Sequence, residues 1–240
     1  MILKKYIFFI FFFSFGKSMA QDAVADSLFI NKVAEGAIAL YMKTLGESTL
    51  LYNGREYIGI HSRTKGHPFY ASDLPQKGSV FYNGTLYQHP AVTYDLVQDE
   101  IFINAYQNIP VKLLSEKIDH FSLEGREFVK MVQQPKDKNV LNSGFYEILY
   151  KGVVTVYAKS KKQLEPSFNL EDPYRFVQYD RYFIKKDDAY HEVNTAGALL
   201  SLFSGHQKEI RRYLRNENIN FKKNRELAIV QGVKYYAQIK

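Results

Sequence analysis

Histidine and acidic side chains are the groups of this sequence that could carry metal or acid–base chemistry. His61 and His67 bracket a short segment, and His89 follows a strand-like run. Histidine is the commonest metal ligand in proteins, but Arg63 and Lys65 lie between the first two and oppose a bound cation. The other histidines fall in expected strands or in a first helical turn: His120, His191 and His206. We interpret all six as loop or structural histidines.

Two adjacent pairs of carboxylates, Asp99-Glu100 and Asp187-Asp188, are candidates for glycosidase-type acid and base catalysis. Both pairs fall where strands are expected to turn. Turns favour Asp because its short side chain accepts hydrogen bonds from the local backbone. We therefore interpret both pairs as solvated turns.

The composition removes several classes of site. The 240 residues include no Cys, which excludes disulfides, thiolate zinc sites, iron–sulfur ligation and cysteine nucleophiles. The sequence contains no G-x-S-x-G or H-E-x-x-H motif, no P-loop and no dinucleotide-binding fingerprint. We predict a non-enzymatic protein without catalytic, metal-binding or cofactor-binding residues.

The basic residues are concentrated towards the C-terminus. The formal net charge is +7, with 12 basic and 15 acidic side chains in residues 21–150 but 17 and 10 in residues 151–240. Four of the later cations recur at i, i+3, i+4 and i+7 and therefore form one stripe on a helix. The candidate interaction face consists of these four and three that follow: Lys208, Arg211, Arg212, Arg215, Lys222, Lys223 and Arg225. It is either a solvated helix surface or a contact for anionic head groups or an acidic protein of a cell envelope.

Helical patterns occur at both ends of the chain. Residues 26–46 follow the helical period and end at Gly46, where a C-terminal glycine cap is expected. The pattern returns at 196–203, after Asn194 or Thr195. Residues 204–207 fit a capping box that opens a helix through Asn216. A last helix is predicted at 225–238, with these residues on one side: Leu227, Val230, Val233 and Tyr236.

Between these ends, short alternating runs predict strands. The clearest turns are Asn53-Gly54 and Asn83-Gly84, because Asn-Gly is the preferred pair for a tight hairpin. Further strands are expected at 92–96, 101–105, 109–114, 118–123, 128–132, 145–150, 153–158, 175–185 and 190–193, and loops at 61–78, 134–143 and 160–173. Strands this close together leave no room for crossover helices. We predict an α+β fold, mainly antiparallel β, in which a curved meander or an open barrel-like sheet is flanked by an N-terminal helix and by C-terminal helices.

Tyrosine is abundant in the expected strands. The chain holds 19 Tyr and 18 Phe and no Trp. Aromatic side chains in half-buried strands most often fill a core. Exposed on a concave face, the same rings would suit a lipid, a glycan or a peptide, and both interpretations stay open.

The N-terminus has the three parts of a secretory signal peptide. Lys4 and Lys5 precede an apolar run at 6–15, and Ser18 and Ala20 are the small residues expected before a cleavage site. Ten apolar residues span about 15 Å as a helix, half of a hydrocarbon core of roughly 30 Å, which argues against a membrane anchor. We predict a signal peptide at 1–20 and a single β-rich domain at 21–240 whose part 195–240 is helical.

Removing this segment leaves 29 basic and 25 acidic side chains, a net charge of +4. We therefore predict an exported protein that is periplasmic, associated with the outer membrane or secreted, with no transmembrane segment after cleavage and no nucleic-acid partner.

Several segments resemble uncharacterised exported proteins common in Bacteroidetes-type bacteria. The resemblance rests on the leader and helix, on residues 51–57 and 144–152, on Leu199-Leu200-Ser201-Leu202-Phe203 and on Tyr235-Tyr236. It implies a Gram-negative envelope and no activity or site residue. The predicted layout also resembles that of periplasmic lipoprotein carriers.

These observations support three hypotheses. The first is a non-enzymatic binding or accessory module that contacts an envelope protein or the outer membrane. The second is a periplasmic carrier of a lipid or other apolar ligand in an open β-barrel, and the third is a hydrolase. A large apolar cavity inside the sheet would favour the carrier, and a histidine hydrogen-bonded to a carboxylate in a cleft would favour the hydrolase.

Overall fold

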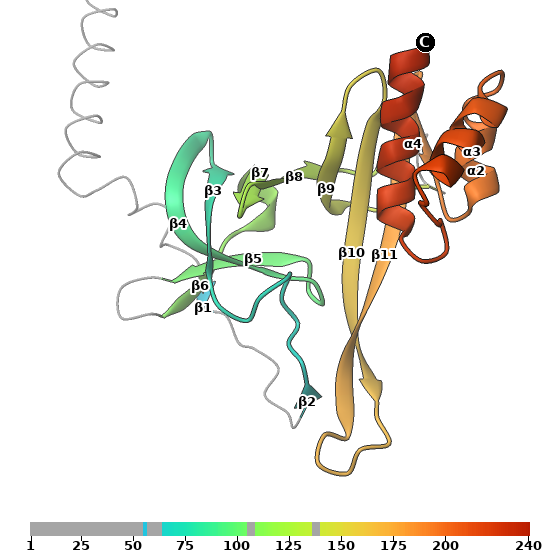
Figure 1. Ribbon diagram of the computed structural model, residues 1–240. Coiled ribbons are helices and arrows are strands. Elements are labelled where there is room, and N and C mark those ends of the chain that lie inside the picture. The colour runs from blue at the N-terminus through green and yellow to red at the C-terminus, as the bar shows by residue number, and fades with distance from the viewer. Residues whose placement is uncertain (1–54, 57–63, 105–108, 136–139) are drawn as a thin grey trace, which may run out of the picture. The chain divides into compact units, whose positions relative to one another are not determined.

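Twelve strands form one hydrogen-bonded sheet in the computed structural model (Figure 1), which describes residues 55–56, 64–104, 109–135 and 140–240. The strands are β1 (Arg55–Glu56), β2 (Thr64–Lys65), β3 (Gln76–Tyr82), β4 (Thr85–Asp95), β5 (Glu100–Asn104), β6 (Pro110–Lys112), β7 (Ile118–Leu123), β8 (Arg126–Met131), β9 (Gly144–Lys151), β10 (Thr155–Pro166), β11 (Tyr174–Lys186) and β12 (Ala189–Glu192). A 3-10 turn, η2 (Ser115–Lys117), precedes β7.

The strand order is β1-β6-β5-β4-β3-β7-β8-β9-β10-β11-β12, with β2 paired to β11. Neighbouring strands are antiparallel except β2 and β11, which are parallel, so the prediction of a mainly antiparallel sheet is confirmed and the sheet is mixed. The order departs from a simple meander at β3, because β4, β5 and β6 lie on one side of it and β7 pairs with its other side.

The second predicted Asn-Gly hairpin is confirmed. Asn83 and Gly84 join β3 to β4 with φ angles of 51° and 81°, the left-handed conformation that this turn requires at both positions. The first Asn-Gly pair, the signal peptide and the helix expected at 26–46 lie outside the described residues.

The loop predicted at 160–173 is wrong over its first seven residues. Strands β10 and β11 pair continuously from Thr155 opposite Lys185 to Pro166 opposite Tyr174, and only 167–173 form the connecting tip. Polar residues dominate 160–166, so no apolar alternation marks the strand in the sequence. Continuous antiparallel pairing satisfies the backbone donors and acceptors there.

Three helices follow the sheet: α2 (Ala196–Ser201), α3 (Gln207–Asn216) and α4 (Arg225–Ile239). Thr195 caps α2, since its hydroxyl accepts a hydrogen bond from the Ala198 N–H at 3.1 Å. The predicted capping box before α3 is wrong. The N-cap is His206, which makes no side-chain cap hydrogen bond, because Gly205 has a φ of 95° and the chain turns there before the helix begins.

The buried side of α4 also differs from the prediction. Its buried residues are Ala228, Ile229, Gly232, Val233 and Tyr236, whereas Leu227 is 41% exposed. Val233 and Tyr236 belong to both sets, and Leu227 lies outside the contact because the buried side of the helix is centred on Ala228, Ile229 and Val233.

Two large apolar clusters fill the described part of the molecule. In the first, the rings of Tyr94, Phe121, Phe128 and Phe145 pack against one another with centroids 4.6–6.1 Å apart. The second joins the helices to the sheet and contains Val156, Ile184, Ile210, Ile229 and Val233. The prediction that tyrosines fill a core is confirmed for Tyr82, Tyr87, Tyr94, Tyr146 and Tyr182, which are buried, whereas Tyr174 and Tyr179 are about half exposed.

None of the helices in the described residues is long and apolar enough to cross a membrane.

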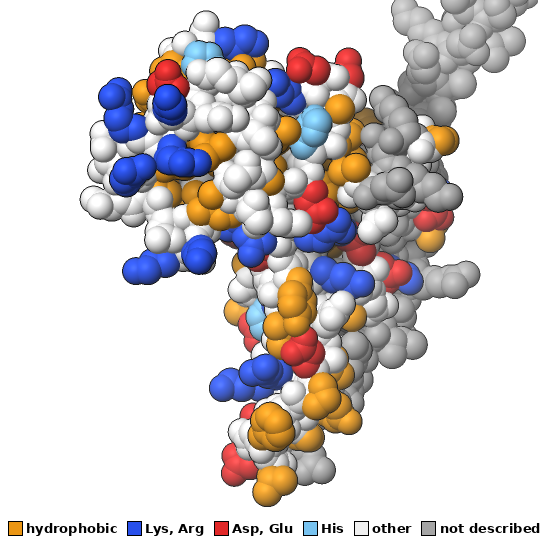
Figure 2. All heavy atoms as spheres, turned by 90° about the vertical axis from the view of Figure 1, so that its right-hand side faces the viewer, with side chains coloured by type: hydrophobic (Ala, Val, Ile, Leu, Met, Phe, Trp, Pro, Cys, Tyr) orange, Lys and Arg blue, Asp and Glu red, His pale blue; other side chains and the backbone are white. Residues whose placement is uncertain are grey.

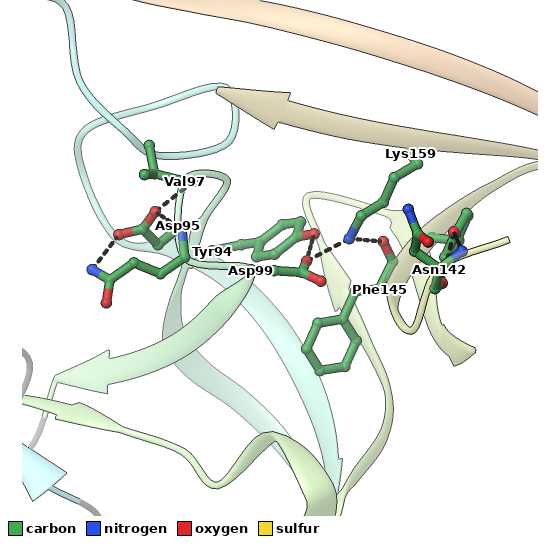
Figure 3. Close-up of polar contacts among 9 residues, drawn as sticks. Tyr94, Asp95, Val97, Asp99, Asn142, Phe145 and Lys159 are labelled. Atoms are coloured by element: carbon green, nitrogen blue, oxygen red, sulfur yellow. Dashed lines mark hydrogen bonds and ion pairs between the residues drawn. The ribbon is translucent and has the colours of Figure 1, made fainter. Parts of the chain in front are cut away.

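A partly buried ion pair links the β4–β5 turn to β10 (Figure 3). The Lys159 ammonium donates to Asp99 Oδ1 at 2.6 Å and to the Phe145 carbonyl oxygen at 3.0 Å. The Tyr94 hydroxyl donates to the same Asp99 oxygen at 2.5 Å. Gly144 lies against this group, since a Cβ there would overlap Asp99 Oδ2 and lie 2.7 Å from Lys159 Nζ.

Gly144→Ala is therefore expected to destabilise the protein by about 3 kcal/mol, because it adds left-handed strain at a φ of 147° and displaces a partly buried charge pair. Gly125→Ala is the matched control. Gly125 also has a positive φ, 78°, but a Cβ there meets nothing within 4 Å, so backbone strain of about 1 kcal/mol is its only cost. Denaturant unfolding of both variants measures the difference, and equal losses would contradict the role of the ion pair.

Candidate functional site

The predicted basic residues lie on one surface built by α3, the α3–α4 connection and the start of α4. Helix α3 turns Ile210 into the core, where it is fully buried, against α2 and α4. That orientation follows from the sequence, because Ile210, Tyr213 and Leu214 occupy one stripe of the helix and the cations the other. The connection is held by Asn220, whose Oδ1 accepts from the N–H groups of Lys222 and Lys223 at 2.9 and 3.2 Å.

We call this surface the basic face; its seven members are Lys208, Arg211, Arg212, Arg215, Lys222, Lys223 and Arg225. All seven are exposed. The ion pairs among the described residues use other cations, and none of the seven takes part in one. Figure 2 shows Lys and Arg side chains gathered on this side of the molecule around a hydrophobic area.

A hollow of about 530 Å³ opens among α2, α3 and the α3–α4 connection. Its apolar residues are Ala196, Leu199, Leu200, Leu214, Ile219 and Phe221. The cations Arg211, Arg215 and Lys222 of the basic face also line it. We call it the α2–α3 hollow. Its lining is therefore amphiphilic, with an apolar part next to three unpaired positive charges.

A second hollow, of about 630 Å³, lies between the other end of the basic face and β11. Lys222, Lys223 and Arg225 line it together with Asp180 and Glu192. The Arg225 guanidinium lies 5.9 Å from the centre of the Tyr182 ring, a cation–π contact. Glu192 is already paired with Arg181 at 2.7 Å. This hollow contains both signs of charge and has less preference for an anion.

The described histidines do not form a catalytic or metal site. His67 Nδ1 accepts from the Phe69 N–H at 3.2 Å, and burial lowers its pKa. His120 stacks on Phe81 and His206 packs against Tyr236, with ring centroids 5.0 and 5.6 Å apart. Across the described residues, no three His, Asp or Glu side chains gather as a metal site would require. His61 and the side chain of His89 lie outside the described part.

The predicted solvated turns are correct for one carboxylate pair only. Asp187 and Asp188 form the β11–β12 turn with side chains 88% and 90% exposed. Asp99 lies in a turn with a φ of 58°, but its side chain is bound by Tyr94 and Lys159 as described above. Glu100 pairs with Lys112 at 3.0 Å. Long-range partners, 60 residues away for Asp99, could not be predicted from the local pattern.

No local pattern of the sequence marks the buried carboxylate of Glu147, on β9. Its two oxygens accept from Tyr70 at 2.9 Å and from Arg126 at 2.5 Å, and only 6% of the residue is exposed. A cleft of about 550 Å³ beside it is lined by Arg126, Glu147, Glu226 and Lys234. Both Glu147 oxygens accept a hydrogen bond, and burial raises the pKa of the Tyr70 hydroxyl, which keeps this donor protonated.

Comparison with family models, curated proteins and solved structures finds no match to this chain.

Glu226, near the start of α4, is expected to make stability depend on pH. Burial first, and then the negative charge of Glu147, raises its pKa above the ordinary 4.5. The folded state therefore disfavours the carboxylate at neutral pH, and the cost is relieved as the pH falls through the raised pKa, because the folded protein takes up the proton before the unfolded chain does. The helix N-terminus offsets part of this cost.

Glu226→Gln should accordingly raise the Tm at pH 7, and the gain should shrink as the pH falls towards 4.5. Glu171→Gln, in the exposed tip of the β10–β11 hairpin, is the control and should leave the Tm unchanged at both values. Thermal unfolding followed by circular dichroism checks both. A Tm gain of Glu226→Gln that is the same at every pH would contradict this account.

Proposed function

We propose that the protein is an exported, non-enzymatic module of a cell envelope that contacts an anionic partner through the basic face. The observation that carries the proposal is the set of seven exposed cations without an acidic partner among the described residues. Clustered cations raise the local concentration of anions and attract negatively charged membrane surfaces. The envelope offers such surfaces as lipid head groups or acidic proteins.

The sequence supports export independently. The segment 1–20 combines two lysines, a ten-residue apolar run and small residues before Gln21. A location in the periplasm or at the outer membrane would give the basic face access to anionic lipids. It would also separate the face from nucleic acids, the other common partners of basic surfaces.

The carrier hypothesis has less support inside the sheet. A carrier would need an open cavity inside the sheet. The aromatic rings around Tyr94 instead pack against one another there. The hydrolase hypothesis has no histidine hydrogen-bonded to a carboxylate among the described residues to support it. The amphiphilic α2–α3 hollow, outside the sheet, is where an apolar ligand finds more support.

Neutralising the central part of the face tests the proposal. Arg211, Arg212 and Arg215, all changed to Gln, should weaken binding to phosphatidylglycerol vesicles roughly 100-fold, because each cation near an anionic surface contributes about 1 kcal/mol. The control changes Lys65, Lys117 and Lys151 to Gln; these are equally exposed lysines on other elements. Co-sedimentation at low and physiological salt measures both, and partitioning of the same variants into the native envelope fraction extends the test. Equal loss in the two triple variants would contradict a localised face.

Export has its own test. Expressed with its native N-terminus in a Gram-negative host, the mature protein should begin at Gln21, since cleavage is expected after Ala20. N-terminal sequencing of the protein released from the periplasm checks this. Recovery of the full-length chain in the cytoplasm alone would contradict the proposal.

A further inference from the structure

The α2–α3 hollow divides into an apolar part and a charged part. Leu199 and Leu200 line it but are only 0% and 6% exposed, so the half-buried Leu214, Ile219 and Phe221 provide its accessible apolar surface. Arg211 and Arg215 are four residues apart on α3, so their side chains emerge one above the other on the same face. Lys222 approaches from the α3–α4 connection. A volume of about 530 Å³ lies within the range of small-molecule sites.

The three cations that line the hollow, Arg211, Arg215 and Lys222, are placed to bind an anion. Two guanidinium groups side by side repel each other unless an anion lies between them, and neither makes an ion pair with a described carboxylate. Guanidinium is suited to bind carboxylate or phosphate oxygens through paired N–H donors. An anion placed between these cations would accept their hydrogen bonds and would lie next to the apolar side chains of the hollow.

The remaining polar group of the hollow argues against a peptide as the occupant. A peptide brings N–H groups that need acceptors when they are taken out of water. Among the side chains that line the hollow, the acceptor is Asn220 Oδ1, which is already bound by the N–H groups of Lys222 and Lys223. An alkyl chain needs no such partner.

We infer that the α2–α3 hollow is a binding site for a single-chain anionic amphiphile. Its alkyl chain lies against Leu214, Ile219 and Phe221, and its phosphate or carboxylate head group is held by Arg211, Arg215 and Lys222. The inference rests on the proposed function, because it identifies the anionic partner of the basic face as lipid-like. The same chemistry is available from a free amphiphile or from a lipid in an anionic membrane.

Alkyl phosphates of increasing length, kept below their critical micelle concentrations, probe the free form by titration calorimetry. Each added methylene should strengthen binding about fourfold until the hollow is filled, since burying one contributes about 0.8 kcal/mol. Inorganic phosphate should bind far more weakly than dodecyl phosphate. Affinity that does not change with chain length would overturn the inference, because charge alone would then account for the binding.

Two double variants separate the hollow from the general charge of the face. Arg211→Gln with Arg215→Gln removes two cations that line the hollow, and Lys208→Gln with Arg212→Gln removes two from the same helix that do not. The first should weaken dodecyl phosphate binding at least tenfold, and the second less than about threefold. Equal effects of the two pairs on dodecyl phosphate would overturn the inference while leaving the basic face intact. If neither pair affects anionic vesicles, the proposed function itself fails.

Gly197 offers a test that leaves all charges in place. It lines the hollow and is exposed, and a Cβ there would meet only Thr195 Oγ1, at 3.8 Å. Gly197→Phe should therefore fill the mouth of the hollow without disturbing the fold, and Gly197→Ala is the small control. The Phe variant should retain the Tm and lose dodecyl phosphate binding at least tenfold, while the Ala variant should bind normally.

Vesicles of phosphatidylglycerol identify the source of the amphiphile. Loss of vesicle binding in Gly197→Phe together with loss of dodecyl phosphate binding supports the site for both sources. Loss on vesicles alone supports it for a membrane lipid. Unchanged binding of dodecyl phosphate and of vesicles in the folded Phe variant would overturn the inference. The inference would also be overturned if alkyl phosphates did not bind and an acidic peptide bound to the native protein but not to Gly197→Phe.

Discussion

The Lys159–Asp99 ion pair is the contact on which the arrangement of the sheet depends. Asp99 follows β4, and Lys159 belongs to β10, although β3, β7, β8 and β9 separate these two strands in the hydrogen-bonded order. The pair can form only because the sheet curves enough to bring the β4–β5 turn to β10. Burial lowers the pKa of Lys159, and Asp99 opposes that shift. An unpaired charge at this depth would be costly, so each partner makes the other tolerable.

A second set of contacts fastens the long β10–β11 hairpin at the same place. The Lys162 N–H donates to the Leu96 carbonyl oxygen at 3.1 Å, and its ammonium donates to the carbonyl oxygens of His67 and Phe69 at 3.0 and 2.6 Å. The Lys162 side chain thus provides hydrogen bonds to two carbonyl oxygens of the irregular segment that contains His67 and Phe69. Helices α2–α4 pack on β10 and β11 through Val156 and Ile184. The helices that carry the basic face are therefore held by apolar packing on β10 and β11, and these polar contacts in turn hold β10.

The sequence predicts those features of the fold that depend only on residues close together in the chain. The Asn83-Gly84 turn needs only the conformational preferences of two residues, and the stripe of cations on α3 needs only the helical period. The β10–β11 pairing beyond Ser160 could not be predicted, because Lys161, Lys162 and Gln163 show no strand alternation and are held by a register set elsewhere. The same limit applies to Glu147, whose partner Tyr70 lies 77 residues away.

The like charges of the basic face lower the stability of helix α3. On α3, like charges at i and i+4 destabilise a helix by about 0.2–0.5 kcal/mol per pair, and Lys208 with Arg212 and Arg211 with Arg215 are two such pairs. Burial of Ile210 and the contacts with α4 offset that cost without requiring any cation. Gln at these positions would preserve the helix and remove the repulsion. The charges therefore contribute little to the stability of the folded chain, and the proposed binding of an anion beside the apolar hollow would explain both their position and their lack of partners.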